Sequence, residues 1–282
     1  MISFPNCKIN LGLNIIGKRA DGYHDLETVF YPLQLTDALE IIRADATDLS
    51  PQSTPVFSTS GLPIPGDQNN NLCIKAYQLL KKDFPALAPI KIHLHKAIPM
   101  GAGLGGGSAD ASFTLQLLNK KFNLNLSEKK QIEYAAELGS DCPFFVINQP
   151  SIAKGRGEIL SPFTLNLSAY NFVLVHPGIH ISTKWAFEQI KPFRQNPPIQ
   201  EIIETPIQNW KSTLFNDFEA PIAAAFPEIN TIKNKLYETG AVYASMSGSG
   251  STVFGIYQKD ITHNMHLHFN HRVDQINGHS IA

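Results

Sequence analysis

Residues 99–112 read PMGAGLGGGSADAS, and this stretch decides how the rest of the chain is interpreted. Five of its fourteen residues are glycine, which has no Cβ, so consecutive backbone N–H groups can turn toward one point. A concave row of amides binds anions. The overlapping residues 108–118, SADASFTLQLL, have the small and then apolar pattern of a helix. Its positive end would lie beside the anion, so the stretch predicts a phosphate-binding loop.

Other interpretations of these glycines are weaker. Gly101, Gly103 and Gly106 satisfy G-x-G-x-x-G, but a dinucleotide fingerprint needs a strand directly before it and an acidic residue about 20 positions on. Pro99 interrupts the approach, and residues 121–126 hold no acid. No G-K-[ST] is present, which excludes a Walker loop. A flexible linker stays open, although linkers are not flanked by a strand-like run and an Ala/Leu helix.

The Pro-x-Gly-x-Gly-Leu-Gly-x-x-Ser-Ala pattern resembles the central phosphate loop of the GHMP kinases. The resemblance implies an α+β, two-domain architecture with the active site in the interdomain cleft. Residues 1–155 would form the N-terminal ATP-binding domain and residues 156–282 the C-terminal substrate domain. ATP and Mg²⁺ would be the cofactors, with Ser108 a candidate Mg²⁺ ligand. The residues implied to bind ATP are Pro99, Met100, Gly101, Ala102, Gly103, Leu104, Gly105, Gly106, Gly107, Ser108, Ala109, Asn71, Leu72 and Lys96.

Length and composition bound the class of protein. The 282 residues suffice for one large or two modest domains, and the net charge of −1 gives no reason to expect bulk binding to nucleic acid or an anionic membrane. No apolar run approaches a membrane span of about 18 residues, and the N-terminus lacks a secretory pattern. Cys7, Cys73 and Cys142 fit a reducing cytoplasm. We expect a cytoplasmic monomer or weak homodimer acting on a small molecule, with no nucleic-acid or membrane partner.

The N-terminal residues 6–16, NCKINLGLNII, alternate as a strand does. The apolar residues form one face, and Lys8 and Asn10 lie together on the other. From alternation alone, an exposed strand lysine is the simpler interpretation of Lys8. After a predicted hairpin turn, Tyr23 and His24 suit either stacking on a base or packing at a strand edge.

Residues 8–33 resemble the N-terminal signature of those GHMP kinases that act on a cytidine diphosphate-linked methylerythritol. By this resemblance Lys8 is a catalytic lysine and Asn10 a substrate contact. Tyr23 and His24 would read the cytosine, with the phenol ring on one face and the imidazole at the edge. The implied partner is that small-molecule substrate.

Between these segments, residues 45–71 are rich in loop-forming residues, and we expect short edge strands and loop. Asn71 can cap a following amphipathic helix, and the family resemblance puts Asn71 and Leu72 in the adenine pocket. Residues 90–96, IKIHLHK, alternate as a strand, with His93 and His95 on a solvated face. By resemblance, Lys96 at its end borders the adenine site.

Asp141 follows a predicted helix that starts after Ser127 and ends at Gly139. We expect the next apolar residues, 144–147, to be a strand. Taken alone, Asp141 is most simply a cap of the next turn, with Pro143 at its first helical positions. The SDxPFF segment resembles the one that holds the catalytic aspartate of the family, which implies that role for Asp141.

The second half of the chain carries weaker signals. Residues 153–163 are expected to be the crossover between domains, and residues 171–177 a strand. The resemblance implies an aromatic ring four residues after Thr183 on the other face of the cytosine, which selects Phe187 over the competing Trp185; packing of both in the core stays open. The SGSGS turn at 247–251 suits either a phosphate or substrate contact or a simple hairpin.

The C-terminal tail is histidine-rich at His263, His266, His268 and His271, and we expect a solvated surface helix rather than a metal site. Two rival functions remain: another small-molecule kinase of the superfamily, or a nucleotide-binding regulator without activity. Tyr23 and His24 argue against the first, because other substrates have no base to stack.

Overall fold

A computed structural model describes residues 1–44, 55–190, 197–259 and 272–277. The architecture is α+β, as expected. The chain divides into two compact units that are not consecutive in sequence. The first unit comprises Met1–Cys7, Leu35–Met100 and Gly105–Asn148, and the second comprises Lys8–Gln34, Gly101–Leu104 and Gln149–Ala282. These units therefore differ from the expected pair of segments joined at residues 155 and 156, and a division into family domains at that point stays a prediction.

The first unit contains a four-stranded sheet in the order β1-β4-β6-β5. These strands are β1 (Ile2–Ser3), β4 (Ala38–Arg43), β6 (Ile90–Lys96) and β5 (Val56–Gly61). Neighbours are antiparallel except β5, which runs parallel to β6 with Phe57 opposite Ile92. The strand expected at 90–96 is confirmed, and its Ile90, Ile92 and Leu94 are buried.

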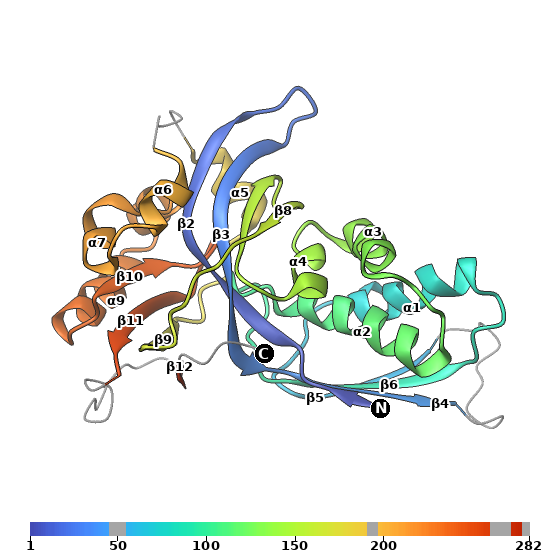
Figure 1. Cartoon of the computed structure of the whole chain (residues 1–282). Coiled ribbons are helices and arrows are strands. Elements are labelled where there is room, and N and C mark those ends of the chain that lie inside the picture. Colours follow the sequence, from blue (N-terminus) through green and yellow to red (C-terminus); the bar gives the residue numbers. More distant parts are fainter. Residues whose placement is uncertain (45–54, 191–196, 260–271, 278–282) are drawn as a thin grey trace. The chain divides into compact units, whose positions relative to one another are not determined.

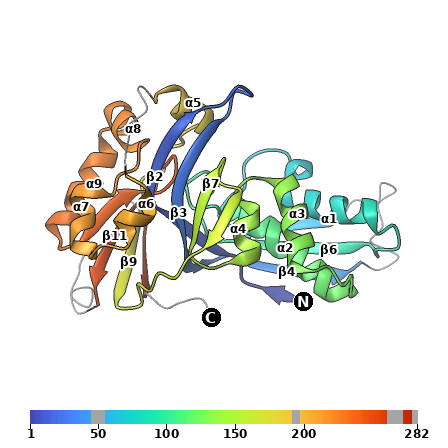
Figure 2. The same cartoon turned by 45° about the horizontal axis from the view of Figure 1, so that its top comes forward.

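Helices cover the sheet of the first unit, as Figures 1 and 2 both show for α1 and α2. The helical elements are η2 (Gln68–Asn70), α1 (Leu72–Asp83), α2 (Gly106–Phe122), α3 (Glu128–Leu138) and α4 (Cys142–Ile147). Their apolar sides share one core with the strands, where Tyr77, Leu80 and Leu115 pack with Ile92.

Side-chain caps fix two of these helices. The Asn71 carboxamide accepts the Cys73 N–H at 2.9 Å, and the Ser127 hydroxyl accepts the Lys130 N–H at 3.2 Å. Both caps were expected from the sequence. The strand expected at 144–147 is wrong, because these residues belong to α4, where a proline at the first positions presets a helical φ.

The second unit contains the remaining two sheets, in the orders β2-β3-β7-β8 and β10-β11-β9-β12. The first sheet has β2 (Asn6–Lys18), β3 (His24–Thr36), β7 (Ser151–Gly155) and β8 (Ile159–Pro162). The second has β10 (Tyr243–Met246), β11 (Val253–Gln258), β9 (Tyr170–His176) and β12 (Arg272–Asn277). Both are antiparallel wherever a register is defined.

Two expectations for the second half are wrong. Residues 153–163, expected to be the crossover between domains, lie wholly within the second unit, where β7 and β8 pair as a hairpin with Ile152 opposite Ser161. Residues 272–277 are a strand rather than part of a surface helix, since Val273 pairs with Val175 of β9. The four tail histidines lie outside the described residues.

Short helices complete the second unit, and two of them, α7 and α9, lie beside its C-terminal sheet (Figure 2). They are α5 (Thr183–Glu188), α6 (Ile199–Ile203), η3 (Ile207–Asn209), α7 (Trp210–Thr213), α8 (Glu219–Ala225) and α9 (Glu228–Glu238). Ile229, Ile232 and Leu236 of α9 pack into a core with Val173 and Ala244. In the described part of the chain, no helix combines the length and apolarity needed to cross a bilayer.

Candidate active site

The first unit holds a cavity of about 260 Å³ beside the start of α1. Four residues expected to bind ATP line it, namely Asn71, Leu72, Met100 and Gly107. The sequence interpretation missed other lining residues, which are Phe57, Thr59, Ile64, Pro65, Gly66, Asp67, Gln68, Asn70 and Asp110. Residues 57–70 gave no signal because loop composition does not reveal which faces line a cavity. Apolar walls with a few amide and carboxyl groups suit a heterocyclic base.

The glycine-rich stretch leads directly into α2. Gly105 is the N-cap in a left-handed conformation and offers no side-chain cap to the first turn. The start of α2 therefore presents backbone N–H groups and a positive helix end, the features that bind phosphate. Gly106 is required by packing, since a Cβ there would lie 3.0 Å from Lys96 Nζ and 2.9 Å from an Ile98 methyl carbon.

Lys96 lies beneath that helix start in a buried ionic cluster. Its ammonium donates to Asp37 and, at 2.8 Å, to Asp110. Asp37 also accepts the backbone N–H groups of Ala97 and Ile98. Burial acts to lower the pKa of Lys96, but the charges of Asp110 and Asp37 outweigh it and raise that pKa. Lys96 is fully buried and is not among the residues lining the cavity, so in this structure it supports α2.

Asp141 also belongs to the first unit, at the N-terminus of α4. Its side chain makes no cap hydrogen bond, so the cap interpretation is not supported by such a bond. The neighbouring Cys142 ties α4 to α2, because its carbonyl accepts the Ser112 hydroxyl at 2.7 Å. Burial raises the pKa of the Cys142 thiol to about 12, while a hydrogen bond from Ser108 lowers it in part. A thiol with so high a pKa is not reactive at neutral pH. Because Cys142 contacts Ser112, the adjacent Asp141 lies near the first turns of α2.

Lys8 and Asn10 lie in the second unit on β2 and contact each other. Lys8 Nζ donates to Asn10 Oδ1 at 2.6 Å and to the Gly103 carbonyl at 3.4 Å, and it lies 4.7 Å from the Phe30 ring centroid. Asn10 Nδ2 donates to Thr28 Oγ1 at 3.0 Å. Lys8 is only 4% exposed, so the interpretation as an exposed strand lysine is wrong.

The SGSGS turn contacts the middle of the phosphate loop within the second unit. Ser247 Oγ donates to the Gly103 carbonyl at 2.8 Å and accepts the Asn10 N–H at 3.2 Å. A Cβ at Gly103 would lie 2.0 Å from the Ser247 carbonyl oxygen, and Gly103 has φ of +78°. Only glycine allows this approach, so the turn is more than a simple hairpin.

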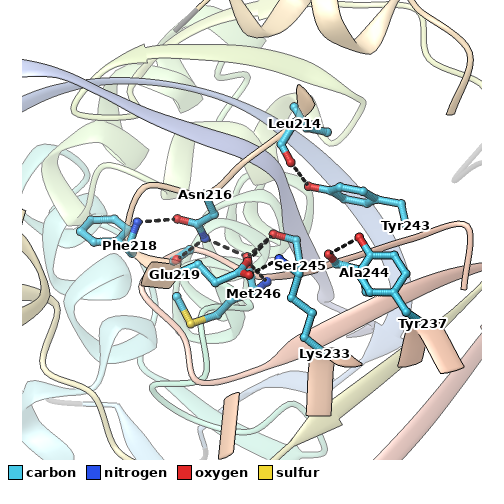
Figure 3. A network of polar contacts seen from close by, with 11 residues as sticks. Leu214, Asn216, Phe218, Glu219, Lys233, Tyr237, Tyr243, Ala244, Ser245 and Met246 are labelled. Carbon is cyan, nitrogen blue, oxygen red and sulfur yellow. Dashed lines mark hydrogen bonds and ion pairs between the residues drawn. The ribbon is translucent and has the colours of Figure 1, made fainter. Parts of the chain in front are cut away.

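A polar network around Asn216, Glu219 and Met246 lies where β10 leads into the turn, and Figure 3 draws it. Asn216 Nδ2 donates to the carbonyls of Met246 and Gly248, each at 2.8 Å. Glu219 Oε2 accepts from Ser245 Oγ at 2.9 Å and from the Met246 N–H at 3.1 Å, while its other oxygen pairs with Lys233. The sequence interpretation included none of these partners, because no motif or periodicity marks them.

The rings expected at the cytosine meet in the second unit. His24 and Phe187 stack with centroids 4.8 Å apart and planes 10° from parallel. Phe187 also meets Phe218 edge to face, whereas Trp185 packs against Phe226. Since His24 and Phe187 already touch, no room for a base exists between those two rings. Tyr23 is 56% exposed and carries the Arg156 guanidinium 5.0 Å from its ring centroid.

Two segments of the chain match known protein families. Residues 71–149 match the family described as GHMP kinases N terminal domain, and residues 199–263 match GHMP kinases C terminal. A crystal structure of the Methanococcus jannaschii mevalonate kinase shares the fold, with a TM-score of 0.69 at 13% identity over 99% of this chain and 98% of that one. The chain belongs to the GHMP kinases.

Two relatives with higher sequence identity share one enzyme name. The 4-diphosphocytidyl-2-C-methyl-D-erythritol kinase of Bacteroides fragilis is 54% identical over 92% of this chain and 93% of its own length. A crystal structure of 4-(cytidine 5'-diphospho)-2C-methyl-D-erythritol kinase matches with a TM-score of 0.78 at 30% identity, covering 93% of this chain and 92% of the other. Within the GHMP kinases, the chain belongs to the 4-diphosphocytidyl-2-C-methyl-D-erythritol kinases.

Proposed function

We propose that this chain transfers the terminal phosphoryl group of ATP to the 2-hydroxyl of 4-(cytidine 5'-diphospho)-2-C-methyl-D-erythritol, in non-mevalonate isoprenoid precursor biosynthesis. The observation that carries the proposal is 54% identity to a kinase of that name over nearly the whole chain. It is supported by the Tyr23 ring, which is exposed and offers aromatic surface to a pyrimidine, and by the cavity beside the phosphate loop.

The chemistry asks for positioning and charge neutralisation more than covalent work. Amides of residues 101–107 and the start of α2 bind the triphosphate. Asp141 accepts the proton of the tertiary hydroxyl as it attacks the terminal phosphorus. Lys8 stabilises the developing negative charge on the reacting oxygens. The hydrogen bond from Lys8 to Asn10 orients the ammonium group. Tyr23 stacks on the cytosine, while His24 contacts its edge.

A magnesium ion would neutralise phosphate charge when bound. Mg²⁺ prefers oxygen ligands and keeps several waters, so it does not need a cage of protein ligands. The Ser108 hydroxyl in the first turn of α2 is a ligand of that kind. The residues fit the ion, and Ser108 would hold it.

The remaining expectations belong to the same proposal. The cysteines are buried thiols, which fits a reducing cytoplasm as the site of action. We propose a monomer or weak homodimer that acts on a small molecule and binds neither nucleic acid nor membrane.

A test of acceptor choice separates this proposal from its rivals. ADP release is measured with the cytidyl substrate, with homoserine and with mevalonate at equal concentrations. We expect turnover with the cytidyl substrate alone and competitive inhibition of that reaction by CDP. Turnover with another acceptor and no effect of CDP would contradict the proposal, and no turnover with any acceptor would favour a regulator without activity.

A further inference from the structure

Asn216 lies in the second unit between the end of α7 and the start of α8. It is 4% exposed, and all the polar atoms of its carboxamide are used. Both Nδ2 hydrogens go to backbone carbonyls at the start of the SGSGS turn, those of Met246 and Gly248, at 2.8 Å each. Its Oδ1 accepts the Phe218 N–H at 3.0 Å (Figure 3). The side chain therefore fixes where β10 ends and the turn begins.

The turn held by Asn216 also contacts the Gly103 carbonyl, which the proposed catalytic Lys8 approaches. Ser247 lies between the two carbonyls bound by Asn216, and its hydroxyl donates to the Gly103 carbonyl at 2.8 Å. The Lys8 ammonium approaches that same carbonyl oxygen at 3.4 Å. On the far side of the turn, the Thr252 N–H donates to the Ala102 carbonyl at 3.2 Å. Two backbone positions of the phosphate loop are thus held by the turn that Asn216 holds.

The backbone beside Asn216 is tied to the strand that carries Lys8. The Leu13 N–H donates to the Phe215 carbonyl, and the Asp217 N–H donates to the Leu13 carbonyl, each at 2.9 Å. Asp217 Oδ2 also accepts the Ile15 N–H at 2.8 Å. Asn216 is therefore fixed to β2 through its neighbours and to the turn through its side chain.

We propose that Asn216 is a positioning residue that sets the distance between β2 and the SGSGS turn, and so aims Lys8 and the Gly103 carbonyl. The inference rests on the proposed role of Lys8. A small misplacement of a catalytic group costs rate much more than binding when the substrate contacts are untouched, and about 1 Å can cost about 10²-fold. Tyr23 and His24 make none of the hydrogen bonds described for Asn216. Asn10 and Phe187 are one contact further away, through the Ser247 hydroxyl and the Phe218 ring, so kcat is expected to fall more than substrate affinity.

The test compares Asn216→Asp with Asn119→Asp. The first variant keeps the acceptor for Phe218 N–H but turns an oxygen toward two carbonyls in place of two donors. Asn119, at the end of α2, has a similar pair of bonds to the Leu126 backbone, at 3.1 and 2.9 Å, with no link to the turn. We expect kcat to fall about 10- to 100-fold in Asn216→Asp, with KM for the cytidyl substrate within about threefold. Asn119→Asp keeps the wild-type kcat at temperatures where thermal unfolding shows both variants folded.

Amide hydrogen exchange supplies a readout independent of turnover. In Asn216→Asp, exchange at Ser247 and Thr252 is expected to speed up, while strand β3 keeps its wild-type protection. A wild-type kcat in Asn216→Asp, or equal losses of kcat in both asparagine variants, would overturn the inference. Lys8→Ala distinguishes failure of the proposed function from failure of this inference. A near-normal kcat in Lys8→Ala would overturn the catalytic role of Lys8. A large loss of kcat in Lys8→Ala together with a normal kcat in Asn216→Asp would overturn only the positioning role of Asn216.

Discussion

At the scale of single residues, Asp141 carries the most specific chemical prediction. A general base contributes about 10²–10⁴-fold to turnover. Asp141→Ala is therefore expected to lower kcat by that factor while leaving binding of an ATP analogue within a few fold. A coupled ADP assay and a binding titration measure the two quantities. Glu133→Gln is the control, since Glu133 forms an exposed pair with Lys130. Near-normal turnover of Asp141→Ala would contradict its role.

His24 predicts a pH dependence of substrate binding. Burial lowers its pKa below the usual 6.5, and the charge of Lys18 lowers it further. The ring is thus neutral at pH 7, and a neutral imidazole has one acceptor nitrogen. As the pH falls from 7 through that lowered pKa, protonation removes the acceptor, and KM for the cytidyl substrate is expected to rise. His24→Gln should remove this rise, and an identical pH profile in that variant would refute the assignment.

At the scale of elements, the contact between the glycine-rich stretch and the SGSGS turn makes Gly103 sensitive. An added Cβ would meet the Ser247 carbonyl oxygen at 2.0 Å, in a left-handed conformation. Gly103→Ala is expected to lower the free energy of unfolding by about 1–3 kcal/mol and to reduce kcat. Gly17→Ala is the control, because a Cβ there meets no atom within 4 Å. Equal denaturant midpoints for both variants would contradict the packing described.

The buried ionic cluster beneath α2 predicts how stability depends on pH. Burial raises the pKa of Asp110 to about 8, even though Lys96 acts to lower it. The pKa of this carboxyl is higher in the folded protein than its value of 3.8 in the unfolded chain. The folded protein therefore loses stability as the pH rises between those two pKa values. Asp110→Asn cannot ionise, so its melting temperature relative to wild type should increase from pH 4 to pH 8. A constant difference would show that Asp110 does not titrate in this range.

The elements also show how far sequence reasoning reaches. Alternation correctly predicted the strand at 90–96, and side-chain chemistry correctly predicted the caps Asn71 and Ser127. A strand was wrongly predicted at residues 144–147, which belong to a helix, because a short apolar run fits a strand and a buried helix equally well. The burial of Lys96 was not predicted, because its partners Asp37 and Asp110 lie 59 and 14 positions away in the sequence and no periodicity connects them.

At the scale of the whole molecule, the candidate groups come from segments far apart in the chain. The cavity and Asp141 belong to the first unit, and Lys8 with the aromatic rings belongs to the second. The motifs could be predicted one by one because each has a local pattern. The supporting groups, such as Asn216, could not, since only tertiary structure brings them to the turn.

The central claim is that Lys8 and Asp141 act in one phosphoryl transfer step, and a double-mutant cycle on kcat tests it most directly. Product formation from ATP and the cytidyl substrate is measured for Lys8→Ala, for Asp141→Ala and for the double variant. Groups that act as a unit are strongly non-additive, so the double variant should be about as slow as the slower single variant. Losses that multiply in the double variant would show that the two residues act independently and would contradict the account.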